Sequence, residues 1–193
     1  MRKLHVSLSE TSKIIKSITS DLKLQETINT VTQEIIRCFN TGKKVMFCGN
    51  GGSAADAQHL AAELSGRFYL DRFPLPAEAL HVNSSYITAV ANDYSFDKIY
   101  SRYVAGAGKE GDILIGMTTS GNSENIIQAF NAARENKIIT VGFTGKNGGR
   151  ITQLSDFLIQ VPSTIIPRIQ EMHLLIGHVI CETVEKEMFG NEG

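Results

Sequence analysis

The chain has 193 residues, of which 42% are hydrophobic and 20% are charged, and its formal net charge at pH 7 is −1. This length and composition suit a single globular domain over residues 1–193 and exclude a largely disordered chain. The near-neutral charge provides no general attraction to nucleic acid or to an anionic membrane. We therefore expect neither as a partner, and an anionic ligand needs a local site.

Cysteine usage and the first residues indicate the compartment. Cys38, Cys48 and Cys181 lie in apolar runs and lack the spacing of a metal site, so we expect reduced thiols in the core. The N-terminal residues lack the continuous apolar segment of a signal peptide, and no apolar run approaches the ~18 residues of a membrane span. The sequence therefore predicts a cytoplasmic protein.

Two helices are predicted ahead of the first strand, in an extension of about residues 1–42. Apolar residues recur at Ile15, Ile18 and Leu22, and a second series begins at Leu24. Both series have the three- and four-residue spacing of an amphipathic helix.

Beyond this extension, short apolar runs alternate with helical patterns. The strand-like runs are KVMFCG, AEALHV, DILIGMTT, KIITVGFTG and DFLIQV. The segments with helical character between them are SAADAQHLAAELSG, SYITAVANDYSFDKIYSRYVAGAG, NSENIIQAFNAARENK and GGRITQLS. This alternation predicts an α/β fold, in which helices cover both faces of a parallel sheet of about five strands.

The last helix is predicted over about residues 166–188 (IPRIQEMHLLIGHVICETVEKEM). Its apolar residues point in nearly every direction around the helix axis, which is typical of a helix that is buried all round. A terminal helix of a monomer usually keeps a solvent face. We therefore expect this helix and the two N-terminal helices to lie in an interface of a homo-oligomer.

A glycine-rich loop follows the first predicted strand. Residues 49–53 (GNGGS) are called the glycine loop, and Gly49, Gly51 and Ala54 fit the dinucleotide-binding pattern Gly-x-Gly-x-x-Gly/Ala. The glycines let the backbone approach a ligand, and Ser53 can cap the following helix or donate its hydroxyl group. A turn followed by a helix cap explains the same residues, so both interpretations stay open.

A second loop is rich in hydroxyl groups. Within the segment TTSGNSEN, residues 118–123 are called the hydroxyl loop, and they carry the side chains of Thr118, Thr119, Ser120 and Ser123. Four hydroxyl groups at one strand end exceed what a helix cap uses, and with the neighbouring amides they can surround one phosphate. No lysine follows either glycine cluster, so a sugar phosphate is favoured over a nucleoside triphosphate.

The end of the second predicted strand argues against a dinucleotide. A dinucleotide site requires an acidic residue there to bind a ribose hydroxyl group. The strand ends instead in HVNSS, which offers His81 and Asn83. We therefore expect no nucleotide cofactor.

Two of the predicted helices carry polar residues that can act together. His59 and Glu63 are four residues apart, about 40° around a helix axis, so both can face one cavity. Gln170 and His178 lie on the last helix about 80° apart. The alternatives are an exposed helical pair for the first two residues and a core histidine for His178. His173 lies nearer the apolar stripe and is assigned a structural role.

Four segments together resemble the sugar isomerase (SIS) domain family: CGNGGSAADAQHLAAELSGRF, ANDYSFDKIYSRYV, GDILIGMTTSGNSENI and PRIQEMHLLIGHVI. The resemblance covers nearly the full chain, and the motifs AQHLAAEL and RIQEMH are similar to the branch that acts on heptose phosphates. It implies a homotetramer of flavodoxin-like three-layer subunits. The implied reaction converts sedoheptulose 7-phosphate to D-glycero-D-manno-heptose 7-phosphate, the first step toward activated heptose for bacterial surface polysaccharide.

The resemblance also assigns substrate-binding positions. The phosphate-binding segment of the family falls on Thr118, Thr119, Ser120 and Ser123. The other substrate-contacting positions fall on Asn50, Gly51, Gly52, Ser53, Glu63, Asn92, Asp93 and Gln170. The chain departs from the family at Thr118, where many members have serine, and at Pro167, where some have an acidic residue; Pro167 is given no role.

By the same resemblance, the acid/base pair falls on Glu63 and His178. A zinc site, with one ion per subunit, falls on His59, Glu63, Gln170 and His178. Aldose–ketose interconversion moves one proton between two carbons and another between their oxygens, so we expect Glu63 to carry the carbon-bound proton and His178 to serve the oxygens and ring opening. Zinc would stabilise the enediolate oxygen, but a ligating side chain is less free to carry protons, and the sequence leaves this question open.

Two alternatives belong to other functional classes. One is a non-catalytic SIS-domain protein that associates with the bacterial replication initiator, a relative that lacks the acid and the histidine at the positions of Glu63 and His178. The other is an isomerase or regulatory domain for a different phosphosugar. Glu63 and His178 favour the enzyme. Because the last helix is expected in an interface, the active site is expected to be shared between subunits of the homotetramer.

Overall fold

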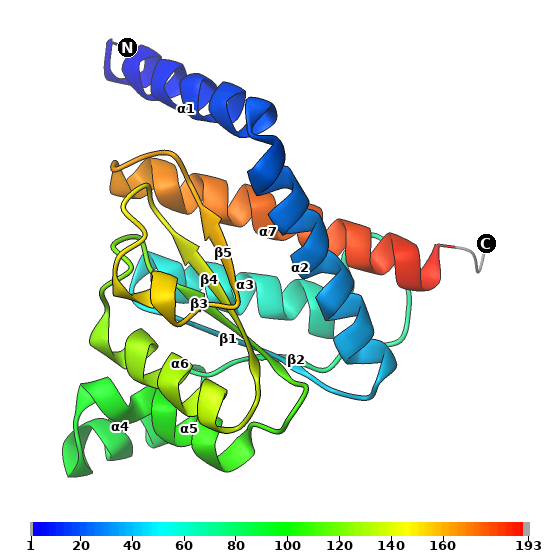
Figure 1. Cartoon of the computed structure of the whole chain (residues 1–193), viewed down its shortest axis with the longest axis vertical. Coiled ribbons are helices and arrows are strands. Elements are labelled where there is room, and N and C mark those ends of the chain that lie inside the picture. Colours follow the sequence, from blue (N-terminus) through cyan, green and yellow to red (C-terminus); the bar gives the residue numbers. More distant parts are fainter. Residues whose placement is uncertain (1, 191–193) are drawn as a thin grey trace.

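The computed structural model describes residues 2–190, and Figure 1 shows a central sheet with helices on both sides. Its helices are α1 (Arg2–Ser20), α2 (Leu22–Asn40), α3 (Gly52–Ser65), α4 (Ser84–Asp93), α5 (Ile99–Ala107), α6 (Glu124–Glu135) and α7 (Ile166–Phe189). Its strands are β1 (Val45–Gly49), β2 (Ala77–Ala79), β3 (Ile113–Met117), β4 (Ile139–Thr144) and β5 (Phe157–Gln160). Two short 3-10 turns are η1 (Phe96–Lys98) and η2 (Arg150–Gln153).

The five strands form one parallel sheet in the order β2-β1-β3-β4-β5. This is the doubly wound order of flavodoxin-like proteins, in which the chain starts at an inner strand and winds outward in both directions. The predicted fold class is therefore confirmed, together with the five strands and the two additional helices ahead of β1.

Both faces of the sheet are buried, which explains the continuous apolar runs in the sequence. Within β1, Val45 and Phe47 join the core with residues of α2, α3 and α7. Met46 and Cys48 point the other way and join the core with α5 and α6. Figure 1 shows α2 and α7 above the sheet and α5 and α6 below it.

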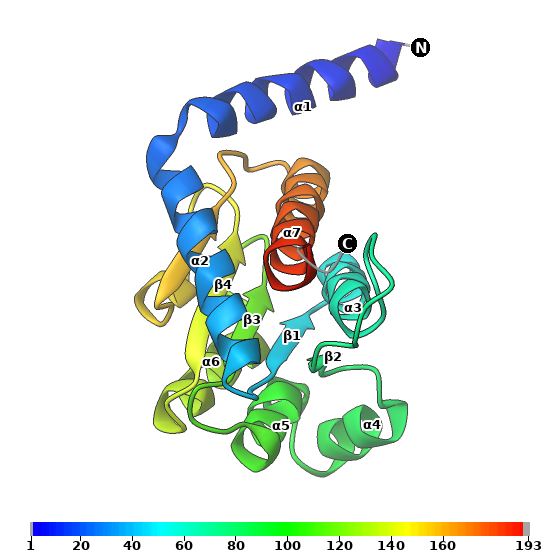
Figure 2. The same cartoon turned by 90° about the vertical axis from the view of Figure 1, so that its right-hand side faces the viewer.

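The first helix points away from the sheet. The chain turns at Asp21, whose carboxylate caps α2 by accepting a hydrogen bond from the Leu24 backbone N–H at 3.0 Å. On the N-terminal side of this turn, α1 runs across the top of the molecule above α7 (Figure 2), where Arg168 of α7 donates to the Ser7 carbonyl oxygen at 3.1 Å. α1 exposes the apolar side chains of Leu4, Val6 and Leu8. A helix of this kind gains stability mainly by packing its apolar side chains against another surface.

The structure differs from the sequence prediction at three elements. The helical pattern over residues 85–108 is broken into α4, η1 and α5, because Tyr94 leaves the helical conformation (φ −126°, ψ −85°) and Ser95 is extended. The predicted second strand pairs only over Ala77–Ala79, at the edge of the sheet. The segment GGRITQLS forms the 3-10 turn η2 rather than a full helix.

The last helix is not buried all round within its own chain. Ile176 and Ile180 are buried, whereas Leu175 and Val179 are 45% and 48% exposed. The two exposed side chains line an apolar groove of about 300 Å³ together with residues of α1 and α2, among them Ile18 and Ile28. The prediction placed this helix in a subunit interface, and the stripe that its own chain leaves exposed is available to such a contact.

The cysteines lie where they were predicted. Cys38, Cys48 and Cys181 are free and buried. Burial raises the pKa of Cys38 and Cys181 to about 12, so these thiols are inert as nucleophiles. Along residues 2–190, the helices lack the combination of length and apolar character needed to cross a membrane.

His173 has the structural role that the sequence predicted. Its side chain is fully buried in α7, its Nε2 lies 3.1 Å from the Thr144 carbonyl oxygen, and its ring packs edge-on against Phe143. Burial lowers the pKa of His173 to about 4 because the charged ring is disfavoured there, although the hydrogen bond with Thr144 acts in the opposite direction. His173 is therefore neutral in the folded protein at neutral pH.

This burial makes stability depend on pH in a defined window. Between about pH 6.5 and pH 4 the unfolded chain binds a proton at His173 that the folded chain does not, so stability falls as the pH falls, by up to about 3 kcal/mol. We expect His173→Gln, which cannot titrate, to flatten this part of the curve. Urea unfolding of both proteins at pH 7, 6 and 5 measures it, and parallel curves would show that His173 makes no such contribution.

Candidate active site

The two ligand-binding loops predicted from the sequence lie side by side. β1 and β3 are neighbouring parallel strands, and Gly49 at the end of β1 pairs with Met117 at the end of β3. The glycine loop and the hydroxyl loop therefore leave the sheet at the same edge and the same level. This is the switch point of the doubly wound sheet, where ligands bind in open α/β folds.

The hydroxyl groups of the second loop do not cap the helix that follows. Ser123 is the N-cap residue of α6, but its side chain makes no capping hydrogen bond. Its Oγ lies 3.1 Å from Thr118 Oγ1, and Ser120 Oγ lies 3.5 Å from the same Thr118 atom. Three hydroxyl groups thus cluster beside a helix N-terminus whose first amides have no side-chain cap.

Other helices of the chain show what an ordinary cap looks like. α2 is capped by Asp21, and α4 is capped by Asn83, which accepts from the Tyr86 backbone N–H at 3.1 Å. α3, which follows the glycine loop, has Gly51 at its N-cap and no side-chain cap. Neither loop caps its helix through a side chain, and α5 and α7 share this feature, so the first amides of α3 and α6 have no side-chain acceptor and are open to an anion.

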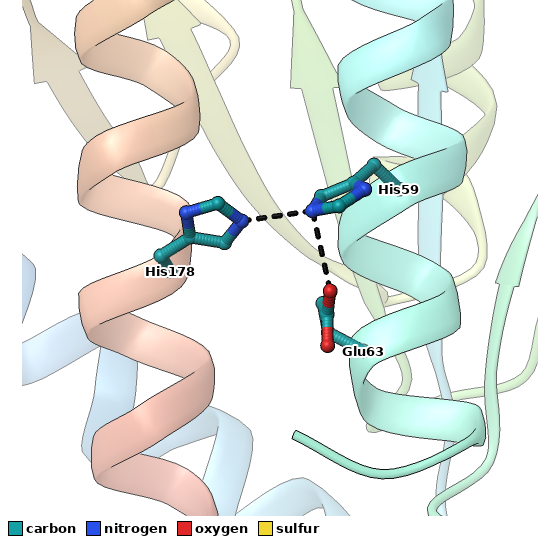
Figure 3. A group of neighbouring side chains, drawn as sticks. All are labelled: His59, Glu63 and His178. Carbon is teal, nitrogen blue, oxygen red and sulfur yellow. Dashed lines mark hydrogen bonds and ion pairs between the residues drawn. The ribbon is translucent and has the colours of Figure 1, made fainter. Parts of the chain in front are cut away.

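Three of the predicted polar residues converge between two helices (Figure 3). His59 and Glu63 lie on α3, and His178 reaches them from α7. His59 Nε2 is 2.8 Å from His178 Nε2 and 3.2 Å from Glu63 Oε1. The His59 side chain is 47% exposed and that of Glu63 is 23% exposed, so the cluster is open to a ligand on one side.

The close approach of α3 and α7 depends on a glycine. Gly177 precedes His178, and a Cβ atom at this position would lie 2.4 Å from Leu60 Cδ1, one residue after His59. The Leu60 side chain occupies the space that a side chain at position 177 would need, and the two imidazole rings meet next to this contact. The Phe68 ring, just beyond α3, lies 5.8 Å from the His178 ring and closes another side of the cluster.

The cluster has the donor set of a metal site. One donor atom from each of His59, Glu63 and His178 lies within 4.8 Å of the others. His59 Nε2 carries at most one proton and cannot donate fully to both neighbours, so a further proton or a cation is needed to relieve the repulsion between lone pairs. Two imidazole nitrogens and a carboxylate oxygen suit zinc.

Gln170 does not join the other three in this chain. Its amide lies against Gly52, where a Cβ atom would come within 2.4 Å of Gln170 Nε2. Gly52 begins α3, and His59 is seven residues further along, about 10 Å at the rise of a helix. The structure therefore places the Gln170 amide beside the glycine loop.

The remaining predicted residues have different surroundings. Thr118 and Ser53 are buried, and Thr119 accepts a hydrogen bond from the Gly145 backbone N–H through its carbonyl oxygen. Asn92 and Asp93 are exposed at the end of α4, where the Asn92 side chain donates to Asp93 at 2.9 Å. The structure does not bring these two side chains into hydrogen-bond contact with either loop among the described residues.

A buried ion pair that the sequence did not reveal orders the chain beyond α3. Glu185 of α7 is 2% exposed and accepts hydrogen bonds from the backbone N–H groups of Phe68, Tyr69 and Leu70 at 2.6–2.9 Å. Its carboxylate also accepts from Arg72 Nε at 3.0 Å. Burial alone would raise the pKa of Glu185, but these four donors outweigh it and lower that pKa.

The arginine of this pair holds the end of α3. Arg72 Nη2 donates to the Glu63 carbonyl oxygen at 2.9 Å, and Nη1 donates to the Leu64 carbonyl oxygen at 2.8 Å. The Arg72 and Glu185 side chains are each 2% exposed, so water does not compete for these bonds. Phe68, which contacts His178, and the backbone of Glu63 are thus tied to α7 through one charged pair.

Comparison with known proteins gives the family. Residues 8–145 match the SIS domain. The phosphoheptose isomerase of Clostridium acetobutylicum is 50% identical over 186 residues, which cover 96% of this chain and 93% of that protein.

Two solved structures share the whole fold. The phosphoheptose isomerase of Neisseria gonorrhoeae superposes with a TM-score of 0.90 at 36% identity, covering 96% of this chain and 98% of that one. The phosphoheptose isomerase of Francisella tularensis superposes with a TM-score of 0.92 at 35% identity, covering 96% and 97%. The chain therefore belongs to the SIS domain family and, within it, to the phosphoheptose isomerases, which makes it an isomerase.

Proposed function

We propose that the protein interconverts sedoheptulose 7-phosphate and D-glycero-D-manno-heptose 7-phosphate, an early step in making activated heptose for bacterial surface polysaccharide. The observation that carries this proposal is the meeting of Glu63 and His178, a carboxylate and an imidazole, at the far end of the helix that begins at the glycine loop. A non-catalytic binding protein has no need for this acid/base pair, and the high identity to phosphoheptose isomerases supports the enzyme.

The phosphate end of the substrate is assigned to the hydroxyl loop. The hydroxyl oxygens of Ser120 and Ser123 lie within 3.5 Å of Thr118 Oγ1, and Ser123 does not use its hydroxyl group to cap α6. The uncapped amides of α6 add donors and the favourable end of the helix dipole. Asn50, Gly51, Gly52 and Ser53 line the path toward α3, and Asn92 and Asp93 are proposed to contact the sugar.

The proton transfers are assigned to Glu63 and His178. Glu63 removes the proton from C1 of the ketose, giving an enediol, and returns it to C2 of the aldose. His178 moves the second proton between the two oxygens and assists ring opening. A positioned side chain of each kind contributes about a hundred- to ten-thousand-fold to the rate. No net oxidation occurs, because the carbonyl group moves from C2 to C1 while one hydrogen moves in the opposite direction.

The same residues are proposed to hold one zinc ion per subunit. His59, Glu63 and His178 fit the ion by donor type and proximity, and the fourth proposed ligand, Gln170, lies further off against Gly52. When bound, zinc supplies Lewis-acid stabilisation of negative charge on the substrate oxygen. Glu63 then keeps one carboxylate oxygen for the proton, since a carboxylate offers two.

The proposal is tested with purified protein and sedoheptulose 7-phosphate, followed by NMR in the presence of EDTA or of added zinc. We expect the aldose 7-phosphate to appear, and the rate to fall after EDTA and recover with zinc. Fructose 6-phosphate serves as the control substrate, because it carries the same ketose end on a shorter chain. Wild-type protein that forms no heptose 7-phosphate under either metal condition would be inconsistent with the proposal.

We propose further that the enzyme works as a cytoplasmic homotetramer with sites shared between subunits. Exposed apolar side chains on α1 and the Leu175–Val179 stripe of α7 support an interface, since such surfaces are usually covered in soluble proteins. The open side of the cluster at His59 leaves room for residues of a neighbouring subunit. Buried free thiols support a reducing compartment.

A further inference from the structure

A pair of asparagines joins the two ligand-binding loops. Asn50 Nδ2 donates to Asn125 Oδ1 at 2.9 Å, and Asn125 Nδ2 donates back to Asn50 Oδ1 at 2.8 Å. Asn50 belongs to the glycine loop, and Asn125 lies in the first turn of α6, directly after the hydroxyl loop. The two residues are 75 positions apart in the sequence, so this contact exists only in the folded chain.

The burial of Asn125 makes the contact specific. Asn125 is 2% exposed, so its amide exchanges hydrogen bonds with Asn50 under little competition from water. Each amide uses one donor and one acceptor on the other, which leaves Asn50 with a second N–H and further lone pairs. A residue that offered oxygen alone at position 125 would face the Asn50 oxygen without a proton between them.

The place of the pair suggests its purpose. The glycine loop follows β1 and the hydroxyl loop follows β3. The hydroxyl loop is held to β4 by the hydrogen bond from the Thr118 backbone N–H to the Phe143 carbonyl oxygen at 2.9 Å, whereas among the described residues the glycine loop is joined to the segment 118–125 by the asparagine pair. We propose that Asn125 is a positioning residue: through Asn50 it holds the glycine loop at a fixed separation from the hydroxyl loop, so that both bind one phosphorylated sugar together. This inference rests on the proposed function of the site.

The kinetic prediction follows from where the pair lies. Asn125 does not hydrogen-bond to His59, Glu63 or His178, so its loss should weaken substrate binding and leave the chemical step nearly unchanged. We expect Asn125→Ala to raise KM for sedoheptulose 7-phosphate about tenfold, the size expected when two neutral hydrogen bonds are lost, with kcat changed less than about threefold. Zinc affinity should stay the same.

A double-mutant cycle separates positioning from general support of α6. In the Asn50→Ala background, adding Asn125→Ala should change KM less than about twofold, because the partner is already gone. Asn131→Ala, on the exposed surface of α6, is the matched control and should leave KM unchanged. A tenfold effect of Asn125→Ala in both backgrounds, or a loss confined to kcat, would overturn the proposal.

A second measurement needs no turnover. Inorganic phosphate is titrated into the wild-type protein while the backbone amide signals of both loops are followed by NMR. We expect signals of the glycine loop to shift together with those of the hydroxyl loop, and the shifts in the glycine loop to vanish in Asn125→Ala. Wild-type shifts limited to the hydroxyl loop would refute the coupling even if the variants fail to fold. A wild type that shows the coupling but no isomerase activity would refute the proposed function instead.

Discussion

Glu63→Gln is expected to lower kcat by about a hundred- to ten-thousand-fold while the protein stays folded. Glutamine keeps the size of the side chain and one carbonyl oxygen near His59, but it cannot take a proton from carbon at neutral pH. Because a carboxylate ligand is lost as well, zinc affinity should also fall. Turnover of sedoheptulose 7-phosphate at saturating zinc, measured by NMR, isolates the loss of the base from the loss of metal.

The matched control is Glu182→Gln, the same substitution at an exposed position of α7. It should leave kcat, KM and zinc affinity unchanged. His178→Ala should also abolish turnover, since it removes the group that serves the oxygens. Near-native kcat in Glu63→Gln at saturating zinc would mean that another residue removes the carbon-bound proton.

Glu185→Ala is expected to lower the free energy of unfolding by about 3–5 kcal/mol, the usual cost of breaking a buried ion pair. Three backbone N–H groups lose their acceptor, and the Arg72 guanidinium is left buried without a counter-charge. A variant that still folds should bind zinc more weakly, because Phe68 and the end of α3 are no longer held against α7. Urea unfolding and zinc titration measure the two effects.

Glu182→Ala, three residues earlier on the exposed side of α7, is the control and should change stability by less than about 0.5 kcal/mol. The lowered pKa of Glu185 gives an independent check. The stabilisation that the Glu185 carboxylate gives to the folded protein is complete above the ordinary carboxyl pKa. It is lost as the pH falls through the lowered pKa that Glu185 has in the folded protein. An alanine variant with wild-type stability at pH 7 would contradict the role of the pair.

Much of the fold was predictable because its determinants are local. Buried parallel strands produce short apolar runs, and the order of these runs with helical patterns specified the doubly wound sheet. The break at Tyr94 was missed because the apolar spacing continues through it, and periodicity does not register a single change of backbone angles. The apolar character around α7 led to the prediction of an interface, but it did not show that Leu175 and Val179 form the side that the chain itself leaves uncovered.

The sequence predicted the residue types of the site, but it did not predict the hydrogen bonds that link the site's elements to one another. His59 and Glu63 share a helix face, and that spacing is visible in the sequence. Asn125 and Glu185 were overlooked because asparagine in a first turn and glutamate near a helix end are common on surfaces. Each nevertheless lies four residues from a buried position, Asn125 from Ala129 and Glu185 from Cys181. That spacing was the available sign that these two polar side chains face inward.

The contact between Gly177 and Leu60 has a consequence for how this enzyme can diverge. The two histidines that meet at the cluster come from helices that pack closely at an apolar contact one residue away from each of them. A lineage that exchanged Gly177 for alanine would have to move the Leu60 side chain, although every ligand-binding residue stayed intact. Selection on the chemistry therefore also acts on a core position, and a larger residue at position 177 is expected to occur together with a smaller residue at position 60.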